Sequence, residues 1–107
     1  MERVKLIALD MDGTLFNSQN EISEKDKETL KRATEAGVAV AVATGRAYVE
    51  LPIEMLYEAG IRYAITGNGS AVYRLPDKEC ILSDCLDNEV VCTIIRELKQ
   101  LDIYYDI

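Results

Sequence analysis

Apolar residues form short runs near the start of the chain, at residues 6–9 and 38–43. Both runs are too short for helices. They are also too continuous for strands with one face in water, so they predict buried strands of a parallel sheet. Residues 61–66 predict a third strand, which is expected to end on the same edge of the sheet.

A helical pattern connects the first two strands. Ser23 predicts an N-cap because Asp26 stands three residues later, and Gly37 predicts the end of the helix near Ala36. The inward face of this helix is expected to carry Leu30, Ala33 and Ala36. A strand–helix–strand unit with a short return is right-handed, so we expect the ends of the two strands to lie side by side.

Residues 47–59 also have a helical pattern, which Pro52 interrupts. The regular helix therefore either starts near Pro52 or kinks there, and Gly60 is expected to end it. Residues 70–82 have the pattern of a β-hairpin around a turn at residues 75–78.

The pattern changes after Ser83. Asp87 or Asn88 predicts the cap of a further helix, which extends to about Gln100. The residues expected to face inward are Val91, Ile94, Ile95, Leu98 and Leu101. Residues 103–107 predict the start of another strand. Together these elements predict an α/β fold.

Two carboxylates follow the first strand, in the sequence Asp10-Met11-Asp12-Gly13-Thr14. Ligands of open α/β sheets bind beyond the carboxyl ends of the strands, where these residues are expected. Neighbouring carboxylates repel each other unless a cation offsets their charge, and Mg²⁺ prefers oxygen ligands. Asp10 is therefore a candidate metal-bound nucleophile, and Asp12 a candidate general acid/base. Gly13 permits a sharp turn, and Thr14 offers a hydroxyl and an N–H to an anion.

Two further loops are expected at the same edge. Thr44-Gly45-Arg46 follows the second strand. Thr44 is expected to reach the same anion through its hydroxyl or its backbone N–H, and Gly45 to allow a tight turn and close approach. Arg46 adds positive charge, with a structural or solvated charge as its other interpretation. Asn68, in the loop after the third strand, either hydrogen-bonds a substrate or the loop that contains the two aspartates, or is a left-handed turn residue.

The first loop has other interpretations. Asp and Gly also serve as plain turn formers. An EF-hand loop that starts at Asp10 would have Glu21 at its twelfth position, but Leu15 stands at the sixth position, where glycine is needed. The Asp-x-Asp metal site of sugar transferases does not account for the following Gly-Thr. The third loop is not a dinucleotide-binding fingerprint, because Val72 occupies its last glycine position.

Composition limits the partners of the chain. Its 107 residues, 49% of them apolar, suffice for one small domain with a packed core. The chain has no run of apolar residues long enough for a membrane span, and its first residues do not have the pattern of a signal peptide. A net charge of −7 argues against a nucleic-acid partner. A phosphate substrate would need local positive charge from a metal ion, Arg46 or helix N-termini.

The sequence contains no histidine, which excludes Ser–His and Cys–His catalysis and leaves a carboxylate as the candidate nucleophile. The three cysteines, Cys80, Cys85 and Cys92, do not have the spacing of a zinc site. We expect them to be buried or half-buried thiols of a cytoplasmic protein.

The segments Asp10–Leu15 and Thr44–Arg46 together resemble two motifs of the haloacid dehalogenase (HAD) superfamily of hydrolases. The order of elements and the segment Thr66–Tyr73 resemble its Cof-type sugar-phosphatase branch, whose members carry an α/β cap. The resemblance implies a HAD-like Rossmannoid parallel sheet. Residues 1–83 would be the N-terminal part of the core domain, and residues 84–107 the beginning of an incomplete cap.

The resemblance also implies a Mg²⁺-dependent phosphatase that acts on small phosphorylated metabolites such as sugar phosphates. Asp10 would form an aspartyl-phosphate, Asp12 would protonate the leaving group and then activate water, and Thr44 would bind the transferring phosphoryl group. The Asp10 carboxylate and the Asp12 backbone carbonyl would hold Mg²⁺. The other residues expected to line the phosphate site are Met11, Gly13, Thr14, Gly45, Arg46 and Asn68.

Members of the family also have a lysine in a third motif and a Gly-Asp-type acidic motif, both after the cap. No glycine precedes an aspartate in this chain. We therefore expect a truncated chain with weak or absent activity. One alternative is a non-catalytic fragment that binds metal or phosphate, or that assembles through an uncovered sheet surface. The other is a flavodoxin-like binding protein whose carboxylates form only a metal site.

Overall fold

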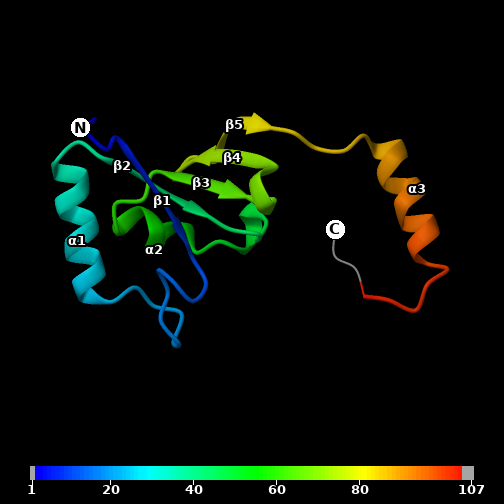
Figure 1. Ribbon diagram of the computed structural model, residues 1–107, viewed down its shortest axis with the longest axis horizontal. Coiled ribbons are helices and arrows are strands. Elements are labelled where there is room, and N and C mark those ends of the chain that lie inside the picture. Colours follow the sequence, from blue (N-terminus) through cyan, green and yellow to red (C-terminus); the bar gives the residue numbers. More distant parts are fainter. Residues whose placement is uncertain (1, 105–107) are drawn as a thin grey trace.

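The computed structural model describes residues 2–104 of the chain. It contains one five-stranded sheet in the order β1-β2-β3-β4-β5 (Figure 1). The parallel strands are β1 (Leu6–Asp10), β2 (Ala39–Ala43) and β3 (Tyr63–Thr66). The predicted hairpin is formed by β4 (Ala71–Arg74) and β5 (Glu79–Ser83), and it extends the same sheet antiparallel to β3. The predicted α/β fold is confirmed.

Helix α1 (Glu24–Glu35) connects β1 to β2. Its predicted N-cap is confirmed, because Ser23 Oγ accepts the Asp26 N–H at 3.1 Å. Its predicted end is also confirmed, since Gly37 has the left-handed φ of +84° that a residue just beyond a helix often adopts. Leu30 is buried against the sheet, whereas Ala36 is exposed, so the inward face is shorter than predicted.

The segment between β2 and β3 divides at Pro52. Residues Tyr48–Glu50 form a single 3₁₀ turn, η1, and helix α2 (Ile53–Glu58) starts directly after Pro52. This is the first of the two predicted alternatives. The helical pattern before Pro52 was misleading, because only one tight turn forms there, and the Glu50 carboxylate caps it by accepting the Ala47 N–H at 2.9 Å.

The hydrophobic core lies around β2 and β3 rather than around β1. Fully buried side chains include Val40 and Val42 of β2 and Leu56 of α2. The prediction that the first strand is buried is wrong for the part of the chain that the structure describes. Within residues 2–104, strand β1 is at the edge of the sheet and pairs with β2 alone, and Leu6 is 54% exposed.

Helix α3 (Asn88–Leu98) follows an extended connection and stands apart from the sheet (Figure 1). Its predicted inward face is not covered, since no residue of α3 is buried and Ile94 and Leu101 are 42% and 58% exposed. Asp87 is at the N-cap, but its side chain makes no capping hydrogen bond. Of the predicted last strand, residues 103–104 are not in a strand, and residues 105–107 lie outside the described residues.

The cysteines differ from expectation. Cys80, Cys85 and Cys92 are all exposed free thiols rather than buried ones. They lie on β5, on the connection after it and on α3, which are the least covered parts of the chain. Among residues 2–104, no helix is long and apolar enough to cross a membrane.

Candidate functional site

Three loops lie side by side at one edge of the sheet, as predicted. Parallel pairing aligns Asp10 with Ala43, and Ala43 with Ile65, so the chain leaves β1, β2 and β3 at neighbouring positions. The residues after these strands are 11–14, 44–46 and 67–69. The sheet therefore brings together the candidate residues that the sequence had placed on separate loops.

The first loop is a tight turn fastened to the core. Met11 is completely buried, and its carbonyl accepts the N–H groups of Thr14 at 3.4 Å and Phe16 at 2.9 Å. Gly13 has a φ of +77°, which glycine adopts without strain. Asp10 and Asp12 on either side of Met11 keep exposed side chains. The predicted place of Met11 in a phosphate site is thus restricted to its main chain, because its side chain belongs to the core.

The two aspartates have different surroundings. The Asp10 carboxylate accepts one long hydrogen bond from the Thr14 hydroxyl at 3.4 Å. None of the ion pairs found within residues 2–104 includes Asp10. Its oxygens therefore remain available for a cation.

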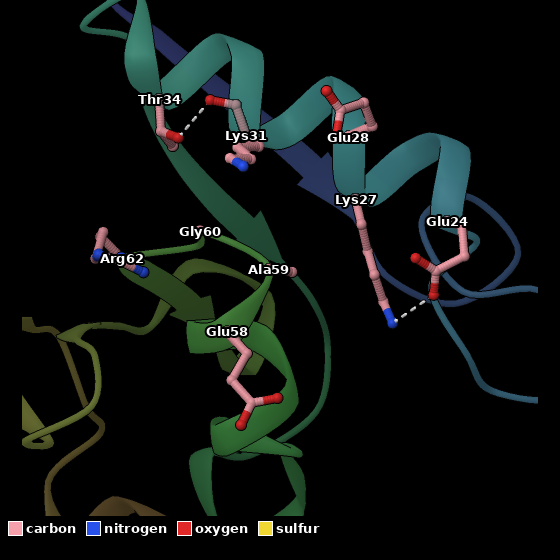
Figure 2. A pocket seen from close by; sticks show the side chains of 9 residues that line it. All are labelled: Glu24, Lys27, Glu28, Lys31, Thr34, Glu58, Ala59, Gly60 and Arg62. Atoms are coloured by element: carbon pink, nitrogen blue, oxygen red, sulfur yellow. Dashed lines mark hydrogen bonds and ion pairs between the residues drawn. The ribbon is translucent and has the colours of Figure 1, made fainter.

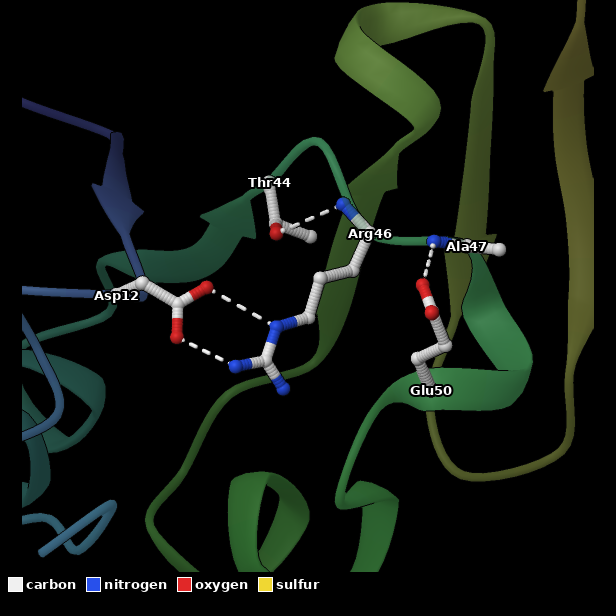
Figure 3. A network of polar contacts seen from close by, with 5 residues as sticks. All are labelled: Asp12, Thr44, Arg46, Ala47 and Glu50. Atoms are coloured by element: carbon white, nitrogen blue, oxygen red, sulfur yellow. Dashed lines mark hydrogen bonds and ion pairs between the residues drawn. The ribbon is translucent and has the colours of Figure 1, made fainter. Parts of the chain in front are cut away.

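Asp12, in contrast, forms a two-point ion pair with Arg46 across the two loops (Figure 3). Arg46 Nη2 is 2.6 Å from Asp12 Oδ1, and Arg46 Nε is 3.0 Å from Asp12 Oδ2. Both side chains are part-exposed, at 37% for Arg46 and 50% for Asp12. Sequence reasoning treated these residues separately. Their places at the ends of paired strands could have indicated that the two residues lie near each other, but not that their side chains pair.

The second loop is held mainly through Thr44, which is buried. Its N–H donates to the Ile65 carbonyl at 2.9 Å, so of the two predicted routes to an anion, the backbone N–H is excluded. Its Oγ1 accepts the Arg46 N–H at 3.1 Å, which leaves the hydroxyl hydrogen to donate elsewhere. The hydroxyl is therefore the group of Thr44 that can contact a ligand.

The third loop packs directly on the second. Asn68 has a φ of +56° and donates its N–H to the Thr44 carbonyl at 3.2 Å. Its side chain lies so close to Gly45 that a Cβ at position 45 would be 2.8 Å from Asn68 Oδ1. The predicted close approach at Gly45 is thus to Asn68. Asn68 has the left-handed turn conformation, and its side chain belongs to the contact between the loops.

Apart from the strand-end loops, a hollow lies between α1 and α2, near the amino-terminal end of β3 (Figure 2). Its charged residues have both signs, and Lys27 pairs with Glu24 at 3.2 Å. This hollow does not concentrate one charge, and its position is away from the carboxyl ends of the strands. The strand-end loops are the better candidate site by both criteria.

A sequence profile of haloacid dehalogenase-like hydrolases matches residues 7–107, which is nearly the whole chain. The chain belongs to this family. The matched segment contains all three strand-end loops. The resemblance that the two motifs suggested is therefore confirmed.

Named relatives of this haloacid dehalogenase-like chain are phosphatases. It is 30% identical to phosphatase YwpJ of Bacillus subtilis over 97% of its own length and 36% of the relative's. It is 38% identical to an HMP-PP phosphatase of Shigella flexneri over 87% of its own length and 34% of the relative's. The chain thus spans about a third of the length of the curated relatives it matches.

Solved structures of haloacid dehalogenase-like proteins have the same fold over most of the chain. A hydrolase of this kind from B. subtilis superposes with a TM-score of 0.77 at 31% identity, covering 91% of this chain and 34% of that structure. The subclass IIB sugar phosphatase BT4131 superposes with a TM-score of 0.76 at 25% identity, covering 91% of this chain and 38% of that structure. These neighbours support the HAD-like sheet that the sequence predicted.

The oxygen donors at the strand-end loops of this chain are of the type that a hard cation binds. The available groups are carboxylate and carbonyl oxygens, which Mg²⁺ prefers. Among the described residues, however, no group of three or more His, Cys, Asp or Glu side chains converges as a metal site would. Of the two aspartates of the first loop, Asp10 is the one that forms no ion pair within residues 2–104, so its carboxylate is the side-chain group there that could contact a cation.

Proposed function

We propose that this chain carries the nucleophile and phosphate-binding loops of a Mg²⁺-dependent phosphatase that acts on small phosphorylated metabolites. The observation that carries the proposal is the unequal environment of the two aspartates. Within residues 2–104 the exposed Asp10 carboxylate forms no ion pair and accepts one long hydrogen bond from Thr14, whereas the Asp12 carboxylate is held by Arg46. One carboxylate is thus available to attack, and the other is fixed beside it to exchange a proton.

In the proposed reaction, an Asp10 oxygen attacks phosphorus, and the bond from phosphorus to the leaving oxygen breaks. Asp12 gives its proton to that oxygen, so that an alcohol leaves and an aspartyl-phosphate remains. Asp12 then takes a proton from water, and the water oxygen attacks phosphorus. Inorganic phosphate is released, and both aspartates return to their starting states.

The residues around the transferring phosphoryl group have separate proposed roles. The Thr44 hydroxyl would donate to its oxygens, and the Thr14 hydroxyl would do so after it turns away from its long contact with Asp10. Main-chain groups of Met11 and Gly13 would lie nearby. Mg²⁺, when bound, would neutralise phosphate charge, and the Asp10 carboxylate with the Asp12 carbonyl would hold it. Gly45 and Asn68 would support this arrangement through the loop contact described above.

Sugar phosphates are the proposed substrates, with the named relatives as support. The subclass IIB neighbour BT4131 is named a sugar phosphatase, and another relative is named a 5-amino-6-(5-phospho-D-ribitylamino)uracil phosphatase. Both names indicate small phosphorylated molecules.

The exposed free thiols support a reducing cytoplasmic location.

We also propose that residues 1–83 are one part of the core domain and that residues 84–107 begin a cap. The break in packing after β5 supports this boundary. Because no third carboxylate joins Asp10 and Asp12 at the strand ends within residues 2–104, we expect the 107-residue chain alone to hydrolyse substrate slowly or not at all. The alternative function is a non-catalytic module that binds metal or phosphate.

Self-association through β1 is part of the same proposal. Leu6 is 54% exposed and Val4 is 60% exposed along an edge that has no strand beside it within residues 2–104. Unpaired edges with apolar side chains tend to pair with another chain. Sedimentation velocity over a range of concentrations tests this. A chain that stays monomeric at every concentration would contradict it.

The test of function is hydrolysis of p-nitrophenyl phosphate with and without Mg²⁺, together with Mg²⁺-dependent binding of inorganic phosphate followed by NMR. Asp10→Asn is the matched control, since it keeps the shape of the side chain and removes its charge. We expect phosphate binding that needs Mg²⁺, and any turnover to disappear in Asp10→Asn. Turnover that survives in that variant, or a folded chain that binds no phosphate, would contradict the proposal.

A further inference from the structure

Arg46 is fixed at three points, and only one of them is the ion pair. Its main-chain N–H donates to Thr44 Oγ1 at 3.1 Å, and its carbonyl accepts the Gly67 N–H at 3.0 Å. Its guanidinium then reaches the first loop and binds both oxygens of Asp12. The residue therefore connects all three strand-end loops.

The first loop fixes the main chain of Asp12 but not its carboxylate. Met11 on one side is buried in the core, and the turn beyond Gly13 is closed by main-chain hydrogen bonds. The Asp12 side chain is half exposed, and the side-chain hydrogen bonds found for it among the described residues come from Arg46. The guanidinium is thus what sets the direction of that carboxylate (Figure 3).

Building on the proposed function, we propose that Arg46 is a positioning residue for Asp12 rather than a phosphate ligand. Its planar fork holds the carboxylate between the loops, in the orientation in which Asp12 exchanges a proton with the leaving oxygen. The guanidinium takes one lone pair on each Asp12 oxygen and leaves a second on each for the exchanged proton, while the Asp10 carboxylate, which forms no ion pair within residues 2–104, is the one available to the metal. The Arg46–Asp12 pair thus gives the two aspartates of the first loop different roles, proton exchange for Asp12 and metal contact for Asp10.

The geometry requires an arginine at this position. The contacts through Nε and Nη2 are a side-on, two-point arrangement that a lysine ammonium cannot reproduce, because it is a single point charge. Arg46→Lys therefore keeps the positive charge near the site and removes the fixed orientation. Arg46→Gln removes the charge as well. The pair of variants separates orientation from charge.

The experiment is NMR of the isotope-labelled full chain, observing the Arg46 Nε–H signal and the Asp12 carboxyl carbon. Inorganic phosphate with Mg²⁺ is the probe. In the unmodified chain we expect an Arg46 Nε–H signal that Asp12→Asn removes, and that persists when phosphate binds. Arg46→Lys should shift the Asp12 carboxyl signal while phosphate affinity stays within a factor of about three, since a lost phosphate-binding fork would cost roughly tenfold or more.

Two results would overturn the proposal. One is transfer of the Arg46 signal from Asp12 to phosphate on titration. The other is a loss of roughly tenfold or more in phosphate affinity in Arg46→Lys, which would make Arg46 a ligand. Where turnover is measurable, kcat should fall in Arg46→Lys while KM is kept.

The two proposals fail in different ways. If the Arg46–Asp12 signature is present but no phosphate binds, the phosphatase proposal fails and the contact stands. If phosphate binds with Mg²⁺ and the signature is absent in the unmodified chain, the positioning role fails and the phosphatase proposal stands.

Discussion

Strands β1 and β2 have similar aliphatic sequences and very different surroundings. The residues of β2 are AVAVA, with its three central side chains buried, whereas those of β1 are LIALD, with alternate side chains exposed. The difference comes from position, since β2 has a strand on each side and β1 has one neighbour in residues 2–104. Apolar composition thus predicts a strand, but the neighbours of that strand decide how much of it is buried.

The two longer helices also show that neighbouring elements, and not apolar composition, decide burial. Helix α1 is the more polar, yet Leu30 anchors it to the sheet and Ser23 caps it. Helix α3 has the more apolar sequence, VVCTII, and none of its residues is buried. The well-packed part of the chain therefore lies around β2 and β3, and the less covered parts are β1, β5 and α3.

The largest expected effect compares valines in the covered and uncovered parts. Val42 of β2 is completely buried, and Val4 before β1 is 60% exposed. Val42→Ala should lower the free energy of unfolding by about 2–3 kcal/mol, because it removes buried methyl groups and leaves a cavity. Val4→Ala should change it by less than about 0.5 kcal/mol. Urea denaturation of both variants measures the difference, and equal losses would contradict the comparison.

The glycines that follow the two strands give the next prediction. Gly13 has a φ of +77°, so Gly13→Ala should cost about 1–2 kcal/mol in stability from backbone strain. Gly45→Ala should cost less, because its new Cβ meets the movable end of the Asn68 side chain at 2.8 Å.

Asn68→Ala is the matched second change. It should relieve Gly45→Ala and leave the cost of Gly13→Ala unchanged. Thermal unfolding of the single and double variants measures both interactions. A rescue of Gly13→Ala by Asn68→Ala would show that the strain had been placed at the wrong glycine.

A smaller effect compares the helix caps. Ser23 Oγ accepts the Asp26 N–H, so Ser23→Ala should destabilise the chain by about 1 kcal/mol. Asp87 makes no such bond, and α3 has no buried residue, so Asp87→Ala should leave the main unfolding transition unchanged. Circular dichroism melts of both variants test this. A similar loss from Asp87→Ala would mean that α3 unfolds together with the sheet.

Local signals made most of the fold predictable. Ser23, Gly37, Pro52 and Gly60 marked helix ends because capping and proline geometry act within a few residues. The burial of β1 and of α3 could not be predicted in this way, since it depends on which elements lie beside them. In a chain that spans about a third of its relatives' length, the neighbours of a strand or helix are the hardest feature to predict from local signals.

The same distinction between local signals and folded neighbours holds for the candidate site. The sequence could place four candidate residues at one edge of the sheet, because parallel strands end at one edge: Asp10, Asp12, Thr44 and Asn68. It could not predict the contacts that these residues make. Neither the pairing of Arg46 with Asp12 nor the engagement of the Thr44 N–H by Ile65 has a signal in residue spacing, because both depend on side-chain and main-chain directions in the folded loops.

The smallest expected effect concerns Tyr48, in the turn that follows the second loop. Its ring packs on Tyr73 with 4.6 Å between ring centroids. Burial raises the pKa of the Tyr48 hydroxyl above 10.0, and the nearby charges of Asp77 and Tyr73 raise it further. The unfolded chain therefore loses this proton first, and the stability of the fold should fall as pH rises through about 10 toward the folded pKa.

Tyr48→Phe removes that proton and keeps the ring. The variant should lose less stability than the unmodified chain when the pH is raised above about 10. Tyr104→Phe is the control, because Tyr104 is 92% exposed and lies beyond α3. Denaturant midpoints measured across alkaline pH give the slope of stability against pH for each variant. If Tyr48→Phe and Tyr104→Phe changed the slope equally, the alkaline loss would come from general charge repulsion. The packed turn around Tyr48 would then protect its hydroxyl no better than the exposed position of Tyr104 does.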